Sequence, residues 1–136
     1  MPRTILIVDD NDAYRGMLRT VLTERGYGVT VVRSGAEGLA AVAADPAIDA
    51  VLADVDMPGM DGFEFCRRLR AEWPPDRPEL PVWIMTGALQ LGLAKRGNAV
   101  GAVLVLRKPF DVDEVCAQFE RTFSARDGQE PRSEPA

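Results

Sequence analysis

Five short apolar runs alternate along this sequence with longer segments in which apolar residues recur at helical spacing. The runs are rich in β-branched and aliphatic residues, which is typical of strands covered on both faces. They occupy residues 4–8, 29–32, 48–53, 81–85 and 102–106. Parallel strands need a crossover connection, and each intervening segment is long enough to hold a helix. The alternation therefore predicts an α/β domain with one parallel five-stranded sheet between two helical layers.

The intervening segments predict five helices, several of which end at proline or glycine. Their expected ranges are 14–22, 36–44, 63–72, 88–96 and 112–123, and Gly97 is expected to end the fourth. Residues 125–136 contain two prolines and no apolar residue larger than alanine. We therefore expect one folded domain over residues 1–124 and a disordered tail over residues 125–136.

Charge and residue usage exclude several classes of function. The 16 basic and 21 acidic residues give a net charge of −5, which argues against direct contact with a nucleic acid. Two cysteines make no disulfide framework and suit a reducing cytoplasm. No apolar stretch reaches the length of a membrane span, so we expect a cytoplasmic protein with no membrane partner. The absence of histidine excludes histidine-based acid–base catalysis and a phosphohistidine within this sequence.

Polar residues follow four of the apolar runs. Asp9 and Asp10 follow the first run, Asp54 the third, Thr86 the fourth and Lys108 the fifth. Ligands of open α/β sheets bind outside the carboxyl ends of the strands, so these side chains are expected to meet at one rim. Three adjacent carboxylates repel one another, and an all-oxygen cluster suits Mg²⁺. Each residue alone is more often a cap, a turn former or a surface residue. Together they predict a magnesium site where a carboxylate accepts a phosphoryl group.

Four motifs at these positions resemble those of the response regulator receiver family of two-component signalling. They are Ile7–Asp10, Asp54–Gly62, Met85–Gly87 and Lys108–Phe110. The resemblance covers about residues 4 to 123 and implies a doubly wound, flavodoxin-like fold with strand order 2-1-3-4-5. It implies a single-domain switch rather than an enzyme with turnover. Such a domain receives its phosphoryl group from a histidine kinase or a histidine phosphotransfer protein. It signals to a downstream protein through the face formed by the fourth helix, fifth strand and fifth helix.

The resemblance also implies roles for the acidic residues. Asp54 is the expected phosphoacceptor. Asp10, Asp54 and the backbone carbonyl of Asp56 are expected to bind Mg²⁺ directly, while Asp9 acts mainly through water. The side chain of Asp56 has three alternative roles: inert and solvated, activating the water that removes the phosphoryl group, or repelling the phosphoryl donor.

The remaining motif residues have expected roles around the phosphoryl group. Lys108 pairs with this group, Thr86 bonds to it and reports its presence, and Gly87 leaves it room. The peptide bond between Lys108 and Pro109 is expected to be cis. The family usually has an aromatic residue in the middle of the fifth strand that moves with the threonine. Val105 stands at this position, so the usual readout is altered here.

The fifth strand is expected at the edge of the sheet, and it begins with apolar residues. Val103 and Leu104 stand where the family usually has acidic residues, and Leu91 and Leu93 lie on the preceding helix. An apolar edge strand promotes association unless it is covered. Either the neighbouring helices cover these side chains, or they form a surface for a partner protein or a homodimer.

Two other functions compete with a phosphorylated receiver. The segment Asp54–Asp56 also resembles the opening motif of haloacid dehalogenase-type phosphatases, but those enzymes have their metal-binding acidic pair late in a longer chain. A receiver-like interaction module that is not phosphorylated is the second alternative. Such modules usually lack the acidic pair, the acceptor or the lysine, and all of these are present here.

Overall fold

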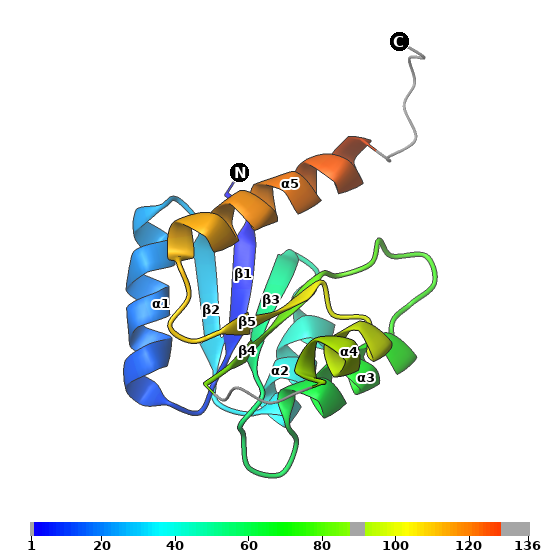
Figure 1. Ribbon diagram of the computed structural model, residues 1–136. Coiled ribbons are helices and arrows are strands. Elements are labelled where there is room, and N and C mark those ends of the chain that lie inside the picture. Colours follow the sequence, from blue (N-terminus) through cyan, green and yellow to red (C-terminus); the bar gives the residue numbers. More distant parts are fainter. Residues whose placement is uncertain (1, 88–91, 129–136) are drawn as a thin grey trace.

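The computed structural model describes residues 2–87 and 92–128, which form one parallel sheet between two layers of helices (Figure 1). The strands are β1 (Thr4–Val8), β2 (Gly28–Val32), β3 (Ile48–Asp54), β4 (Val82–Thr86) and β5 (Leu104–Arg107). Their order in the sheet is β2-β1-β3-β4-β5, and every neighbouring pair is parallel. The predicted fold class and strand order are therefore confirmed.

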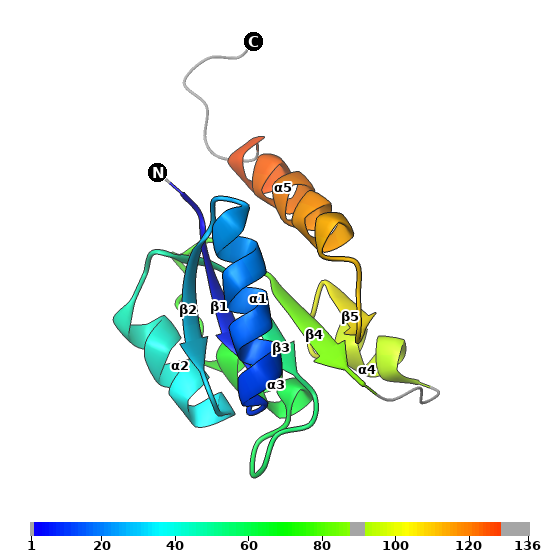
Figure 2. The same cartoon turned by 90° about the vertical axis from the view of Figure 1, so that its left-hand side faces the viewer.

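Five helices connect and cover the strands. They are α1 (Asp12–Glu24), α2 (Gly35–Ala44), α3 (Gly62–Ala71), α4 (Leu93–Ala99) and α5 (Val112–Gly128). Helices α1 and α5 cover one face of the sheet, and α2, α3 and α4 cover the other (Figures 1 and 2). Among the described residues, no helix combines the length and the apolar character needed to cross a membrane.

The central strands are buried on both faces because their side chains alternate between two cores. In β1, Ile5 and Ile7 pack with residues of α1 and α5, whereas Leu6 and Val8 pack with residues of α2 and α3. All four side chains are fully buried. This arrangement explains why the run is apolar at every position rather than at alternate ones.

Helix α4 differs from its prediction at both ends. Its expected first residues, 88–91, lie outside the described residues, and the helix begins at Leu93 after Gly92, whose φ is +86°. Gly97 was expected to end the helix but lies inside it. A Cβ atom built on Gly97 would lie 2.5 Å from Cγ2 of Val105. Glycine at this position therefore allows close packing of the helix on β5 rather than marking a helix end.

Helix α5 is longer than predicted and continues to Gly128. The first four residues of the expected tail, 125–128, are thus helical, and the rest of that tail lies outside the described residues. Two of the four carry ion pairs: Asp127 pairs with Arg3, and Arg126 pairs with Asp49 at 3.4 Å. These partners are distant in sequence, so composition alone could not reveal the extra helical turn. Strand β5 begins two residues later than expected, at Leu104.

Candidate functional site

Three carboxylates meet at the carboxyl ends of the strands, as the strand-end pattern predicts. Asp9 and Asp10 follow β1, and Asp54 is the last residue of β3. One oxygen from each carboxylate can be chosen so that all three lie within 4.8 Å of one another. Asp9 and Asp54 are buried whereas Asp10 is exposed. Such an oxygen cluster, open to water on one side, fits Mg²⁺, which usually keeps several water ligands.

Lys108 extends its ammonium group into the same cluster. Its Nζ lies 2.9 Å from Oδ2 of Asp9 and 3.1 Å from Oδ1 of Asp54. The backbone N–H of Lys108 donates a hydrogen bond to the carbonyl oxygen of Thr86 (2.7 Å), which links the ends of β4 and β5. Thr86 is buried. The Lys108–Pro109 peptide bond is cis, as expected. The structure therefore brings the predicted lysine and threonine to the rim that carries the carboxylates.

The cluster places more negative charge in a buried space than one lysine can neutralise. The pKa of the Asp54 carboxyl is raised from 3.8 to about 6, mainly by burial and also by the nearby charge of Asp9, while Lys108 opposes the rise. Burial also disfavours the charged form of Lys108. Its contacts with Asp9 and Asp54 outweigh that penalty, so the pKa of Lys108 is raised. A divalent cation would relieve the remaining repulsion between the carboxylates.

The backbone around Asp54 is fixed by a close contact with α3. A Cβ atom built on Gly62, the first residue of α3, would lie 2.5 Å from the carbonyl oxygen of Asp54. The N–H of Gly62 donates to the carbonyl of Val55 (3.3 Å), and the N–H of Val55 donates to the carbonyl of Met85 (2.7 Å). The sequence indicated only a glycine-containing loop here. The close approach of α3 to Asp54 was not foreseen.

The start of α1 contributes Tyr14, whose place at the site the sequence reading missed. Asn11 is the N-cap of this helix, since its Oδ1 accepts a hydrogen bond from the N–H of Tyr14 (2.8 Å). The N–H of Asn11 donates to Oδ1 of Asp9 (2.9 Å). The ring of Tyr14 then lies with its centroid 4.2 Å from Nζ of Lys108. The helical spacing of Tyr14 indicated only a core position, and no local signal could reveal its contact with a lysine so distant in sequence.

The expected modulating residues lie at the open side of the site. Asp56 is exposed, and its charge contributes to the raised pKa of Asp54. Gly87 is also exposed, and among the described residues a Cβ atom built there would meet no atom within 4 Å.

The model of the response regulator receiver domain family matches residues 5–120 of this chain. The chain belongs to the response regulator receiver domain family. Two-component signalling is therefore its functional class, and the haloacid dehalogenase-type alternative finds no support. The match includes all of β2 to β5, all of β1 except Thr4, the acidic cluster and Lys108.

Curated relatives of this receiver domain include two bacterial regulators. The DNA-binding transcriptional regulator NtrC of Klebsiella pneumoniae is 38% identical over 130 residues, which cover 95% of this chain and 27% of that protein. The response regulator MprA of Mycolicibacterium vanbaalenii is 39% identical over 119 residues, covering 88% of this chain and 49% of that protein. The chain thus spans about a quarter and about half of the length of these relatives.

Solved structures resemble the receiver domain over almost its whole length. The chemotaxis protein CheY4 of Vibrio cholerae has 30% identity and a TM-score of 0.79, and the match covers 89% of this chain and 98% of that one. The signal receiver domain of a signal transduction histidine kinase from Syntrophus aciditrophicus has 28% identity and a TM-score of 0.80. That match covers 98% of this chain and 97% of the other.

Close packing joins β5 to α4 at Val105, the position where an altered readout is expected. Val105 is half-buried and packs into the core beneath α4, directly against the backbone of Gly97. Helix α4 is also tied to α3, because the guanidinium of Arg96 lies 4.1 Å from the ring centroid of Phe63 and its Nη2 lies 4.0 Å from Oδ2 of Asp61. The position of α4 therefore depends on contacts with both β5 and the start of α3.

The helices do not cover the start of the edge strand. Val103 and Leu104 are each 45% exposed, whereas Leu93 is buried against the core. Leu91 lies outside the described residues. A shallow hollow lined by Val103, Leu104 and three residues of α5 (Gln118, Arg121 and Thr122) lies beside this edge. The prediction that the neighbouring helices cover these side chains is therefore wrong for Val103 and Leu104 and confirmed for Leu93.

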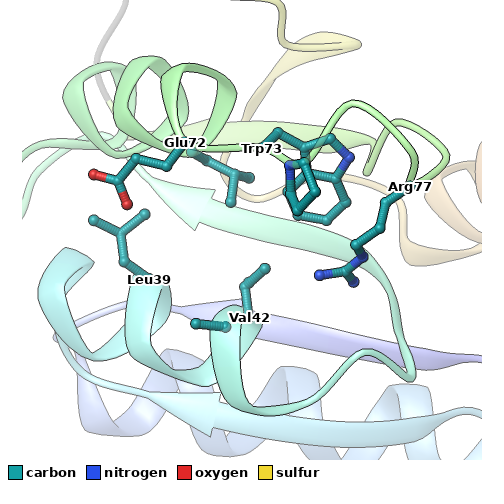
Figure 3. Close-up of a pocket in the computed structure, with 8 residues that line it drawn as sticks. Leu39, Val42, Glu72, Trp73 and Arg77 are labelled. Carbon is teal, nitrogen blue, oxygen red and sulfur yellow. The ribbon is translucent and has the colours of Figure 1, made fainter.

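A separate pocket lies between α2 and α3, away from the acidic cluster (Figure 3). Its apolar wall includes Leu39, Val42 and the ring of Trp73, and Glu72 and Arg77 lie at its rim. The guanidinium of Arg77 lies 4.2 Å from the centroid of the Trp73 ring. None of the predicted site residues lines this pocket.

Proposed function

We propose that this receiver domain is a switch that accepts a phosphoryl group on Asp54. The observation that carries the proposal is the convergence of three carboxylates from two strand ends, with Lys108 3.1 Å from the acceptor. Asp9, Asp10, Asp54 and the backbone carbonyl of Asp56 would hold Mg²⁺, with Asp9 acting mainly through water. The group would come from a phosphohistidine of a histidine kinase or of a histidine phosphotransfer protein.

The transfer exchanges one bond to phosphorus for another. An Oδ atom of Asp54 attacks phosphorus while the bond from phosphorus to the donor nitrogen breaks, and that nitrogen keeps the bonding electron pair. The product is an acyl phosphate on Asp54. When bound, Mg²⁺ would supply neutralising charge for the phosphoryl oxygens. Lys108 would move its ammonium from the Asp54 carboxylate to a phosphoryl oxygen, and Thr86 would offer its hydroxyl to another.

The phosphorylated site would act on the face formed by α4, β5 and α5. This face carries the exposed Val103 and Leu104, and its occupant would be a downstream protein or a second copy of the domain. The usual readout depends on the movement of an aromatic residue on β5. Val105, which is packed beneath Gly97, stands at that position and has no ring to move. The position of α4 as a whole, held by Arg96 at Asp61 and Phe63, would then carry the change.

Phosphorylation by a small-molecule donor tests the acceptor directly. Wild type incubated with acetyl phosphate and Mg²⁺ is expected to gain the mass of one phosphoryl group, and Asp54→Asn is expected to gain none. Asp49→Asn is a matched control in the same strand, at the opposite end of β3, and is expected to be labelled like wild type. Labelling that persists in Asp54→Asn would contradict the assignment. Absence of labelling in wild type would favour the unphosphorylated interaction module.

Hydrogen exchange tests the output face. The amides of β5 and α4 are expected to change their exchange rates on phosphorylation, and a partner protein or a second copy is expected to protect them. A domain that stays monomeric in both states, with identical exchange at these amides and no partner protection, would refute this surface.

A further inference from the structure

The ring of Tyr14 lies against the Lys108 ammonium, a contact to which the proposed chemistry assigns no role. Nζ of Lys108 lies 4.2 Å from the centroid of this ring, well within the range of a cation–π interaction. The same Nζ lies 2.9 Å from Asp9 and 3.1 Å from Asp54. The ammonium is therefore in contact with groups from α1 and from the ends of β1 and β3.

Tyr14 is held through both its backbone and its ring. Its backbone N–H donates to Oδ1 of the N-cap Asn11, and the N–H of Asn11 donates to the Asp9 carboxylate. The ring of Phe110 meets the Tyr14 ring edge to face, with the centroids 6.2 Å apart and the planes at 80°. Phe110 follows Lys108 and Pro109 in the chain. The elements that carry the acidic cluster and the lysine therefore also orient the ring.

A lysine needs such a contact because its side chain is flexible and its charge is strongly hydrated. In the structure the ammonium bridges Asp9 and Asp54. Binding of Mg²⁺ or formation of the acyl phosphate would take away one or both of these carboxylate partners. The aromatic face is not a metal ligand, so it would remain available to the ammonium throughout.

We propose that Tyr14 is a positioning residue that holds the Lys108 ammonium at the acceptor site while its carboxylate partners change. This inference rests on the proposed phosphorylation of Asp54. The part of Tyr14 that matters is the aromatic face rather than the hydroxyl group. Phenylalanine should therefore replace it, whereas leucine should fill the space against Phe110 without offering a face to the ammonium.

The lysine NMR spectrum can test the contact directly because it contains few signals. The chain contains two lysines, Lys95 and Lys108, and Lys95 is exposed on α4. In unphosphorylated, Mg²⁺-free protein labelled with ¹³C-lysine, the Cε protons of Lys108 are expected upfield of those of Lys95 because they lie near an aromatic face. Tyr14→Phe should keep this separation and Tyr14→Leu should abolish it. Equal Lys108 shifts in wild type and Tyr14→Leu would overturn the contact.

The rate of phosphorylation by acetyl phosphate tests the positioning role. Tyr14→Leu is expected to slow the reaction about three- to tenfold, the range expected for loss of a partly desolvated cation–π contact, while Tyr14→Phe stays within about twofold of wild type. In a Lys108→Met background, Tyr14→Leu is expected to cause no further loss. Wild-type speed in Tyr14→Leu, or an equal loss in both backgrounds, would overturn the proposal, because the ring would then not act through Lys108.

Tyr27→Leu separates positioning from a general loss of packing. Tyr27 packs its ring against Phe119, remote from Lys108, and is expected to cost stability without slowing phosphorylation. Equal slowing by Tyr27→Leu and Tyr14→Leu would overturn the positioning role. If wild type accepts no phosphoryl group, the proposed function fails, and the lysine spectrum still decides whether the Tyr14 ring holds Lys108.

Discussion

Substitution of Gly62 by alanine tests whether Asp54, the proposed phosphoacceptor, is held by a backbone contact with α3. The added Cβ would lie 2.5 Å from the carbonyl oxygen of Asp54 and 3.0 Å from its carbonyl carbon, whereas ordinary contact begins at 3.4 Å. Backbone atoms cannot rotate away as a flexible side chain can. The start of α3 must therefore move by nearly 1 Å away from the end of β3, or the Asp54 peptide must tilt.

Two effects of this displacement can be given magnitudes. Overpacking of this kind costs roughly 1–3 kcal/mol of unfolding free energy. The opposing gain of about 1 kcal/mol that alanine provides over glycine applies to a helix interior, and Gly62 is the first residue of α3. A displacement of about 1 Å at a reacting group can slow a reaction by up to about 100-fold. We therefore expect Gly62→Ala to unfold at lower urea concentration and to be phosphorylated at least tenfold more slowly.

Gly16→Ala is the matched control. Gly16 lies in α1, and a Cβ atom there would meet no atom of residues 2–87 and 92–128 within 4 Å. This variant is expected to gain about 0.5–1 kcal/mol in stability and to be phosphorylated like wild type. Urea unfolding and the rate of labelling by acetyl phosphate with Mg²⁺ are measured for both variants. Equal stability and equal labelling of Gly62→Ala and Gly16→Ala would refute the reasoning.

Four further predictions concern the same site and its link to α4. The Asp54 carboxyl has a pKa of about 6 in the folded protein against 3.8 ordinarily, so its contribution to stability is fully present below about pH 3.8 and is lost as the pH rises through about 6. Asp54→Asn should therefore be more stable than wild type near neutral pH in Mg²⁺-free urea unfolding. A difference in unfolding free energy between the two proteins that stays constant down to pH 4 would contradict this. Mg²⁺ at about 100 times its Kd should stabilise wild type by about 2.7 kcal/mol; Asp10→Asn should lose most of this shift in thermal unfolding, and an unchanged shift would remove Asp10 from the ligand set. Asp56→Asn should change the rate of autodephosphorylation by several-fold because Asp56 is exposed beside the acceptor, and an unchanged decay would leave its side chain inert. Gly97→Ala should cost about 1 kcal/mol in urea unfolding because its Cβ would lie 2.5 Å from Val105. The same substitution should cost little in a Val105→Ala background, where the opposing methyl groups are absent.

Much of the site was predictable because of how parallel sheets are built. A crossover connection returns each strand in the same direction, so the carboxyl ends of all strands meet at one edge. A residue placed directly after an apolar run, such as Asp54 or Lys108, is therefore located in space without any knowledge of side-chain packing. The same rule explains why Asp9 and Asp54 are close although they are distant in sequence.

The sequence by itself determined the class of fold, the strand order implied by the family resemblance, and the residues at the rim. These features depend on periodicity and on local motifs. Only the tertiary structure decided how α4 and α5 end, that Val103 and Leu104 are left uncovered, and that Tyr14 faces Lys108. Each of these depends on contacts between segments far apart in the chain, as between Gly97 and Val105 or between Asp127 and Arg3. Such contacts depend on the shapes and charges of both partners, which no local pattern records.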